Sequence, residues 1–252
     1  MGQYFPGNEG EDDVLTKLLK NAKRTIVYTG AGMSTESGLP DFRSAKKGLW
    51  EVEDPSQVAS TDALNRDVER FFQFYRKRVL GVKDCQPHEG YRILADWEKQ
   101  GVIRGIITQN VDGFHSVAGS QNIMELHGTL QQIHCQSCGQ TYSNDRYEEE
   151  VFYCECGGKL RPSVVLFGEG LPEEPFMKAI HESEQADLFI VLGSSLTVSP
   201  ANQFPILAKD SGAKLVIVNL EPTQFDHYAD LVINDRKIGE VLAEVDRNIV
   251  NT

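Results

Sequence analysis

His127 is the residue in this chain best suited to act as a general base. An imidazole with a pKa near ~6.5 gains and loses a proton around neutral pH, and the flanking Leu126 and Gly128 bring no competing charge. The glycine would also let a substrate approach closely. Most histidines are hydrogen-bonded or partly exposed structural residues, so a structural role is the alternative. We assign that role to the remaining histidines, and expect His115 to orient its loop.

Asn110 and Asp112 directly follow an apolar stretch of strand length, residues 102–108. Because they are two residues apart, both side chains would project from the strand end into the same crevice. An amide can bind a ribose hydroxyl or an attacking water, and a carboxylate can accept a hydrogen bond from a carboxamide. The alternative is that Asn and Asp only shape a turn.

A glycine-rich turn, GAGMSTESGLPDFRS (30–44), follows another apolar stretch, residues 25–30. A Gly-x-Gly turn off a strand lets the backbone approach a pyrophosphate, and a following helix N-terminus offers free N–H groups. Thr35 stands where the dinucleotide fingerprint has its third glycine, so a tight turn without a ligand is the alternative. The consecutive Asp41, Phe42 and Arg43 after a proline suit a loop that closes over a ligand.

Two further apolar stretches end in polar residues. LGSS (192–195) brings Ser194 and Ser195, and VNLEP (218–222) brings Asn219 and Glu221. These side chains suit contacts with phosphate or ribose. Ligands of open parallel sheets bind at the carboxyl ends of the strands, so several such ends favour a nucleotide site more than one would.

Four of the five cysteines form a cluster, Cys135-x-x-Cys138, fifteen residues, then Cys154-x-Cys156. This arrangement predicts a four-thiolate zinc site, which has no open coordination position and is therefore structural. The first pair has the spacing of a zinc turn, whereas the one-residue gap of the second pair weakens the assignment of Cys154. A redox thiol pair and a nucleic-acid-binding ribbon are alternatives, and the few nearby basic residues disfavour the ribbon.

The elements that position these residues follow an alternating pattern. Amphipathic stretches at 14–22 and 88–101 predict helices, and Gly101 is placed as a C-terminal stop. Short apolar runs, with hardly any polar alternation, predict strands covered on both faces. The pattern favours an α/β fold with a Rossmann-like doubly wound parallel sheet. The predicted strands are residues 25–30, 102–108, 188–193, 214–219 and 229–233.

Two segments interrupt this alternation and predict a second, smaller zinc-binding and helical domain. Residues 38–84 are polar with a helical pattern, and residues 128–163 contain the cysteines and little apolar content. The Rossmann-like nucleotide-binding domain would then be discontinuous, made of residues 10–37, 85–127 and 164–252.

The chain has 252 residues, with 25 Lys and Arg against 37 Asp and Glu, a net charge of −12. This balance disfavours binding of nucleic acid through bulk charge and is compatible with a Lys-rich peptide partner. No apolar run approaches the ~18 residues that cross a bilayer, and the N-terminus lacks the pattern of a secretory signal. We therefore expect a cytoplasmic protein, monomeric, without direct nucleic-acid binding or membrane contact.

Six motifs in order resemble those of the sirtuins, the NAD-dependent protein-lysine deacylases, in a bacterial-like form. They span residues 30–223, nearly the whole chain: GAGMSTESGLPDFRS, TQNVDGFH (108–115), HG (127–128), RPSVVLFGE (161–169), GSSLTVSPA (193–201) and VNLEPT (218–223). The resemblance implies a two-domain enzyme with its active site between the domains. It would deacylate lysine in proteins or peptides, with NAD as co-substrate and structural Zn²⁺, releasing nicotinamide and O-acyl-ADP-ribose.

The resemblance also implies roles for individual residues. His127 would be the general base, with Asn110 as the second catalytic residue. The segment Val164, Val165, Phe167, Gly168 and Glu169 would pair with the substrate peptide as an added strand. The NAD-binding residues would be Gly30, Ala31, Gly32, Asp41, Phe42, Arg43, Gln109, Asn110, Asp112, Gly193, Ser194, Ser195, Asn219, Glu221 and, as the least defined, Ile238.

Tyr75 and Arg78 lie three residues apart and share a face if their segment is helical. Sirtuins that remove acidic acyl groups carry a similar Tyr-x-x-Arg, which binds the distal carboxylate, so succinyl- or malonyl-lysine is a further candidate substrate. The alternative is an amphipathic helix with packed aromatics and solvated cations. For the whole chain, mono-ADP-ribosyl transfer to protein and a non-catalytic NAD or ADP-ribose sensor are the alternative functions.

Overall fold

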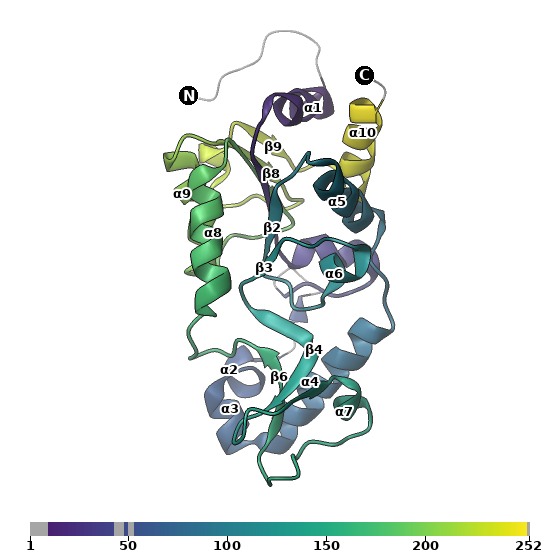
Figure 1. Cartoon of the computed structure of the whole chain (residues 1–252), viewed down its shortest axis with the longest axis vertical. Helices are drawn as coiled ribbons and strands as arrows, with labels where there is room; N and C mark the ends of the chain where they lie inside the picture. The colour runs from purple at the N-terminus through teal and green to yellow at the C-terminus, as the bar shows by residue number, and fades with distance from the viewer. Residues whose placement is uncertain (1–9, 43–47, 50–52, 251–252) are drawn as a thin grey trace.

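The computed structural model describes residues 10–42, 48–49 and 53–250 of the chain. Its larger sheet is built from the apolar stretches, which form parallel strands (Figure 1). Every side chain of the three central strands is buried, as expected for strands covered on both faces. The strands are β1 (Thr25–Thr29), β2 (Gly105–Thr108), β3 (Ile123–Glu125), β7 (Leu188–Leu192), β8 (Lys214–Val218) and β9 (Leu231–Ile233).

The sheet has the order β3-β2-β1-β7-β8-β9, and each neighbouring pair is parallel. Counted along the chain, this is the order 3-2-1-4-5-6 of a doubly wound dinucleotide-binding sheet. The predicted fold class is therefore confirmed. The direction of winding changes between β1 and β7, which is where such sheets bind their ligands. The sequence did not predict β3, because only Met124 of its three residues is fully buried.

Helices cover both faces of this sheet (Figure 1). On one face lie α1 (Glu11–Asn21), α5 (Glu89–Gln100), α6 (Phe114–Ala118) and α10 (Ile238–Val250), and on the other α8 (Glu173–Gln185) and α9 (Phe204–Asp210). Alternate strand residues enter two apolar clusters, so Val27 joins one while Ile26 and Tyr28 join the other. Helix α5 ends at Gly101, whose left-handed φ of 77° confirms the predicted stop.

A second sheet is antiparallel, with the order β5-β4-β6, and contains β4 (Gly128–Cys135), β5 (Thr141–Ser143) and β6 (Leu160–Val164). The sequence did not predict these strands, because β4 alternates polar and apolar residues and the other two are short. Around them lie α2 (Pro55–Val58), α3 (Thr61–Arg66), α4 (Val68–Lys83) and α7 (Asp145–Glu148). Phe72 of α4 stacks on Phe152 at 4.7 Å and meets Tyr147 edge-on, so aromatic rings join α4 to α7 and to the segment that follows α7.

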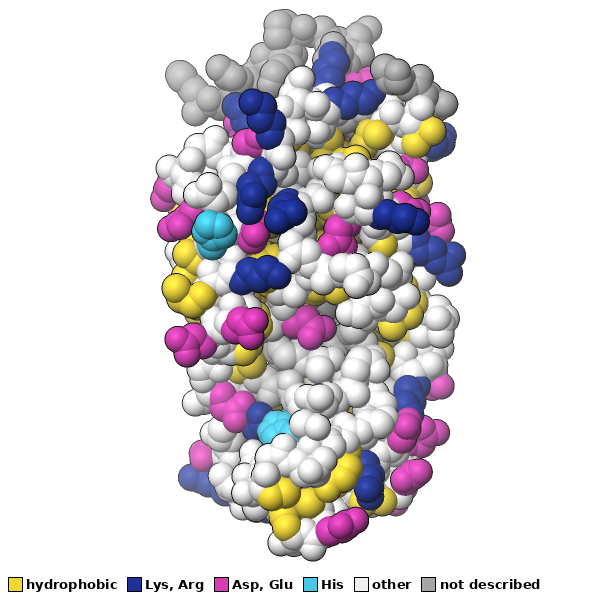
Figure 2. All heavy atoms as spheres, in the orientation of Figure 1, with side chains coloured by type: hydrophobic (Ala, Val, Ile, Leu, Met, Phe, Trp, Pro, Cys, Tyr) yellow, Lys and Arg dark blue, Asp and Glu magenta, His cyan; other side chains and the backbone are white. Residues whose placement is uncertain are grey.

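The surface and the helices bear on two predictions about partners. None of the helices among the described residues is long and apolar enough to cross a membrane. On the face shown in Figure 2, Lys and Arg side chains are interspersed with Asp and Glu side chains.

Candidate active site

A cavity of about 780 Å³ crosses the carboxyl ends of the strands of the larger sheet. Its volume lies in the upper part of the range of ligand sites, ~300–1,000 Å³. Residues that follow β1, β2, β3, β7, β8 and β9 form one side, and the segment after β6 together with α4 forms the other. The cavity brings together most of the predicted site residues: Ala31, Gly32, Asp41, Phe42, Tyr75, Arg78, Gln109, Asn110, His127, Val164, Val165, Phe167, Gly168, Glu169, Gly193, Ser194, Ser195, Asn219, Glu221 and Ile238.

Two loops meet at the switch point between β1 and β7. The Gly32 N–H donates to the Gly193 carbonyl at 2.8 Å, and the Gly30 N–H donates to the Leu192 carbonyl at 3.1 Å. A Cβ on Gly30 would lie 2.7 Å from the Gly193 oxygen, and one on Gly193 would lie 2.3 Å from the Met33 nitrogen. These glycines are thus required first by the packing of one loop on the other, and Gly30 does not line the cavity.

His127 lies at the cavity wall with its ring orientation fixed. Its Nδ1 is 3.1 Å from the carbonyl oxygen of Gln109. A carbonyl oxygen only accepts, so Nδ1 carries the proton and Nε2 is the basic nitrogen of the neutral ring. The His127 carbonyl accepts from the Val165 N–H at 2.9 Å, which joins the histidine to the segment after β6.

Gly128, next to the histidine, is explained by the smaller sheet. It has a φ of +70°, and a Cβ there would lie 2.0 Å from the Ser163 carbonyl oxygen of β6. The close pairing of β4 with β6 therefore requires a glycine at this position, whether or not a substrate approaches it.

Asn110 and Asp112 belong to one buried polar network, but only Asn110 lines the cavity. The Ser34 hydroxyl donates to Asp112 Oδ2 at 2.7 Å, and the Phe114 N–H donates to Asp112 Oδ1 at 2.9 Å. The Asn110 amide donates to Ser34 Oγ at 3.2 Å. Burial raises the pKa of Asp112. The structure thus places Asp112 behind the wall, where it holds the glycine-rich turn against the end of β2.

His115 is a neutral, structural side chain in the same layer. Its Nε2 lies 2.9 Å from the Thr29 hydroxyl, and its ring lies 4.7 Å from the ring of Tyr91. Burial lowers the pKa of His115 to about 3, so the ring carries no charge at neutral pH. It fixes the 108–115 loop to β1, which agrees with the role expected from the sequence.

Tyr75 and Arg78 of α4 both face the cavity, as their spacing predicts. The Arg78 guanidinium lies over the ring of Phe42, 4.7 Å from its centroid, and forms no ion pair in the described part of the chain. Burial lowers the pKa of Arg78 and raises the pKa of Tyr75 to about 12. A desolvated guanidinium beside a neutral phenol is a favourable partner for a carboxylate.

The segment after β6 is anchored on one side by its own chain. The Phe167 N–H donates to the Ala59 carbonyl at 2.9 Å, and the Phe167 carbonyl accepts from the Thr61 N–H at 3.1 Å. Glu169 accepts from Arg161 at 2.7 and 2.9 Å and from the Leu166 N–H at 2.9 Å. Partial burial raises the pKa of Glu169, but these donors outweigh it and hold the pKa below its usual value. Its carboxylate therefore fixes the shape of the loop.

The four cysteines meet away from the cavity, with all their sulfur atoms within 4.8 Å of one another. Cys135 and Cys156 are 3.5 Å apart, and Cys138 and Cys154 are 3.7 Å apart. A Zn–S bond of ~2.3 Å in a tetrahedron separates the sulfurs by ~3.8 Å. The donor set and spacing therefore fit zinc, and include Cys154 despite its one-residue gap. Four sulfurs around one point favour a metal over a single redox pair.

Some lining residues were not among the predicted site residues. Glu36 and Lys237 are charged members of the wall, and Phe74, Leu171 and Phe176 are apolar ones. Phe74 could have been found as a neighbour of Tyr75 in a helix, and Glu36 lies inside the glycine-rich motif, whereas Leu171, Phe176 and Lys237 lie outside the recognisable motifs. The predicted residue Arg43 lies outside the described residues.

Residues 30–200 match the model of the Sir2 family. The chain belongs to the Sir2 family. Among related proteins, this Sir2 chain is 61% identical over 227 residues to an NAD-dependent protein deacetylase of Oceanobacillus iheyensis, covering 90% of this chain and 96% of the relative. It is 56% identical over 235 residues to NAD-dependent protein deacetylase 1 of Geobacillus kaustophilus, covering 93% and 97%. The sirtuin resemblance predicted from the motifs is confirmed.

Solved Sir2 structures share the fold of this Sir2 chain. A Sir2 with a p53 peptide and NAD⁺ has a TM-score of 0.86 and 35% identity, covering 95% of this chain and 98% of that one. A Sir2 with the inhibitor EX-527, 2′-O-acetyl-ADP-ribose and a deacetylated p53 peptide has a TM-score of 0.85 and 34% identity, covering 95% and 99%.

Proposed function

We propose that this chain is an NAD-dependent protein-lysine deacetylase, which releases nicotinamide, the free lysine and O-acyl-ADP-ribose. The observation that carries the proposal is the fixed tautomer of His127 on the wall of a cavity that crosses the strand ends. The related deacetylases and the neighbour that contains NAD⁺ and a peptide support the same reaction.

The residues around the switch point fit NAD as co-substrate. Gln109 Nε2 is buried and has no hydrogen-bond partner among the described residues, although its side chain belongs to the cavity wall. A ribose hydroxyl would supply the missing acceptor. Ser194, whose hydroxyl reaches Gln109 Oε1 at 3.2 Å, lies at the same strand end. We place the nicotinamide end beside Gln109 and Asn110, and the adenosine end beside Asn219, Glu221 and Ile238.

His127 would take up the proton in this reaction. Bound NAD would supply a ribose carbon, which bonds to the acyl oxygen as its bond to nicotinamide breaks, and a ribose hydroxyl, which then loses its proton. Nε2 of His127 receives that proton, while the Gln109 carbonyl on Nδ1–H stabilises the positive charge of the ring. The nitrogen of the Asn110 amide is engaged by Ser34, so Oδ1 is the atom that accepts from a ribose hydroxyl or a water.

One assay tests the reaction against its alternatives. The protein is incubated with NAD and a lysine peptide, with and without the acetyl group, and nicotinamide release is measured. Release that depends on the acetyl group supports the deacetylase. Release with the unmodified peptide would instead indicate ADP-ribosyl transfer, and binding of NAD without release would indicate a sensor.

We further propose that the cavity accepts acidic acyl groups. Tyr75 and Arg78 face it together, and the Arg78 guanidinium is desolvated without an ion-pair partner in the described residues. Replacing both (Tyr75→Phe, Arg78→Met) is expected to lower turnover of succinyl-lysine peptide at least ~10-fold relative to acetyl-lysine peptide. Equal effects on both substrates would contradict this part of the proposal.

The remaining expectations are also proposals. The division into a Rossmann-like domain (10–37, 85–127 and 164–252) and a smaller domain (38–84 and 128–163) is supported by the two separate sheets. The monomeric state stays a prediction. A cytoplasmic location is supported by the four-thiolate cluster, because such thiols persist in reducing compartments.

A further inference from the structure

One end of the cavity is formed by the turn that enters α10. Lys237 and Ile238 line the cavity there, and Ile238 is the first residue of the helix. This end also contains Asn219 and Glu221, which follow β8. The shape of the turn therefore sets the shape of the cavity on the side where we place the adenosine part of NAD.

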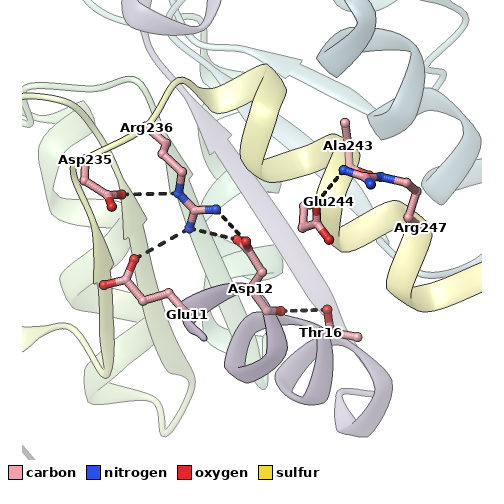
Figure 3. A network of polar contacts seen from close by, with 8 residues as sticks. All are labelled: Glu11, Asp12, Thr16, Asp235, Arg236, Ala243, Glu244 and Arg247. Carbon is pink, nitrogen blue, oxygen red and sulfur yellow. Dashed lines mark hydrogen bonds and ion pairs between the residues drawn. The ribbon is translucent and has the colours of Figure 1, made fainter. Parts of the chain in front are cut away.

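On the upstream side, Arg236 fixes the turn to the start of α1 (Figure 3). Its Nη1 lies 2.5 Å from Asp12 Oδ2 and its Nη2 lies 3.1 Å from Asp12 Oδ1, which is a bidentate pair. Asp235 and Glu11 add weaker contacts at 3.3 and 3.7 Å. The Asp12 side chain is only 15% exposed. Donating hydrogen bonds to the Asp12 carboxylate raises the pKa of Arg236, so the guanidinium stays charged.

On the downstream side, Gly239 fixes the same turn to the glycine-rich loop. Its N–H donates to Glu36 Oε1 at 2.9 Å, so a carboxylate lies at the N-terminus of α10, where the helix dipole favours it. A Cβ on Gly239 would lie 2.7 Å from Glu36 Oε2 and 3.3 Å from His88 Nδ1. Glu36 is itself part of the cavity wall.

The turn is thus held at both ends, and only the downstream anchor touches the cavity. We propose that Asp12 and Arg236, neither of which lines the cavity, are positioning residues for the adenosine end of NAD. This inference rests on the proposed function. Without the pair, residues 236–238 would lose their link to α1 and would have to be ordered when NAD binds, which weakens binding. His127 lies at the other end of the sheet, so the chemical step is left unchanged.

The test replaces one partner at a time, Asp12→Asn and Arg236→Met, and measures steady-state kinetics with NAD and an acetyl-lysine peptide. We expect the KM for NAD and the Kd for ADP-ribose to rise about fivefold, the upper end for a partly exposed pair. The kcat and the KM for the peptide should stay within twofold of the parent. The double variant should be no weaker than the worse single one, because both changes remove the same contact.

Asp13→Asn is the matched control, since Asp13 lies in the same helical turn of α1 and its carboxylate is exposed. It should change neither constant. The inference is overturned if both variants keep the parental KM for NAD, whatever happens to their melting temperatures, or if kcat falls while that KM stays constant. If Arg236→Met does not fold, the isosteric variant Asp12→Asn tests the inference alone, and a parental Kd for ADP-ribose in that variant overturns it. A parent protein that neither binds ADP-ribose nor turns over would instead refute the proposed function.

Discussion

The loops around Gly193 and the turns around Cys138 are both shaped by contacts between segments far apart in the sequence, but the contacts differ in kind. At the switch point, the Gly32 N–H donates to the Gly193 carbonyl and the Gly30 N–H to the Leu192 carbonyl, and the two loops lie too close together for a Cβ. At the smaller sheet, side-chain sulfurs from two turns surround one point. The first pair of loops is complete without a ligand, whereas the second requires a metal to satisfy four thiolates.

The two regions are therefore sensitive to different changes. The switch-point loops continue a sheet whose strands are buried on both faces, so their position depends on packing. Two of the cysteines, Cys138 and Cys156, are exposed, and apolar burial contributes little around them. We therefore expect metal loss to damage the smaller sheet first, and added side-chain volume to damage the switch point first.

The largest effect is expected from a lost zinc ligand. Cys138→Ser should remove most bound zinc and lower the free energy of unfolding by more than about 4 kcal/mol, because metal binding and folding are coupled. Zinc content and urea unfolding followed by fluorescence measure both. Cys85→Ser is the control, since Cys85 lies outside the cluster. A metal-free variant of parental stability would show that side-chain packing alone holds the cysteine turns.

Next in size is the change His127→Ala, which should lower the deacetylation rate by about 10²- to 10⁴-fold, as expected for loss of a general base. The melting temperature should barely change, because the ring is partly exposed. His134→Ala is the control, since His134 bonds Ser163 within the smaller sheet and lies outside the cavity wall. Deacetylation at the parental rate would remove the histidine from the mechanism.

A smaller effect is expected from Gly193→Ala. The residue has a φ of +63° and its Cβ would lie 2.3 Å from the Met33 nitrogen, so strain and overpacking together should cost about 2 to 4 kcal/mol of unfolding free energy. NAD binding should weaken while zinc content stays at the parental value. Gly212→Ala also has a left-handed φ, +104°, but nothing lies within 4 Å of its Cβ. If both variants lose the same stability, loop packing is not what requires Gly193.

The smallest effect concerns pH and the buried layer behind the cavity. Burial in the folded protein lowers the pKa of His115 from 6.5 to about 3. Between these two pH values, His115 is protonated in the unfolded chain but neutral in the native protein. Stability therefore falls on acidification, by about 2 kcal/mol from this ring between pH 7 and pH 5. His115→Gln should remove that loss, measured by urea unfolding at both pH values. The exposed His181→Gln should leave it unchanged, and an equal loss in both variants would exclude His115 as the cause.

Short apolar runs were sufficient to predict the principal strands, because a strand buried on both faces has no polar alternation to obscure it. The four-cysteine cluster could also be predicted from the sequence, because the chemistry of sulfur limits the roles that four closely spaced cysteines can have. The antiparallel strands were not predicted, because Gly128–Cys135 mixes polar and apolar residues in a pattern that a loop also permits.

Several site residues received their place only from contacts across the fold. Asp112 lies in the same motif as Asn110, two residues further along the chain. Hydrogen bonds from Ser34 and Phe114 nevertheless hold its side chain behind the cavity wall. Glu169 belongs to the motif that is predicted to bind the peptide, yet its carboxylate forms an ion pair with Arg161. The ion pair of Arg236 with Asp12 joins residues 224 positions apart, and no local sequence pattern predicts it.

The amino-acid sequence alone determined the fold class, the family and the cluster of four thiols, and it predicted His127 as the base, because each depends on residue types at short spacing. The tertiary structure alone decided which motif residues reach the cavity, why Gly30, Gly128 and Gly193 cannot carry side chains, and what holds the turn into α10. The physical reason is that hydrogen bonds and close backbone contacts between distant segments depend on distances of a few ångströms, which local spacing does not encode.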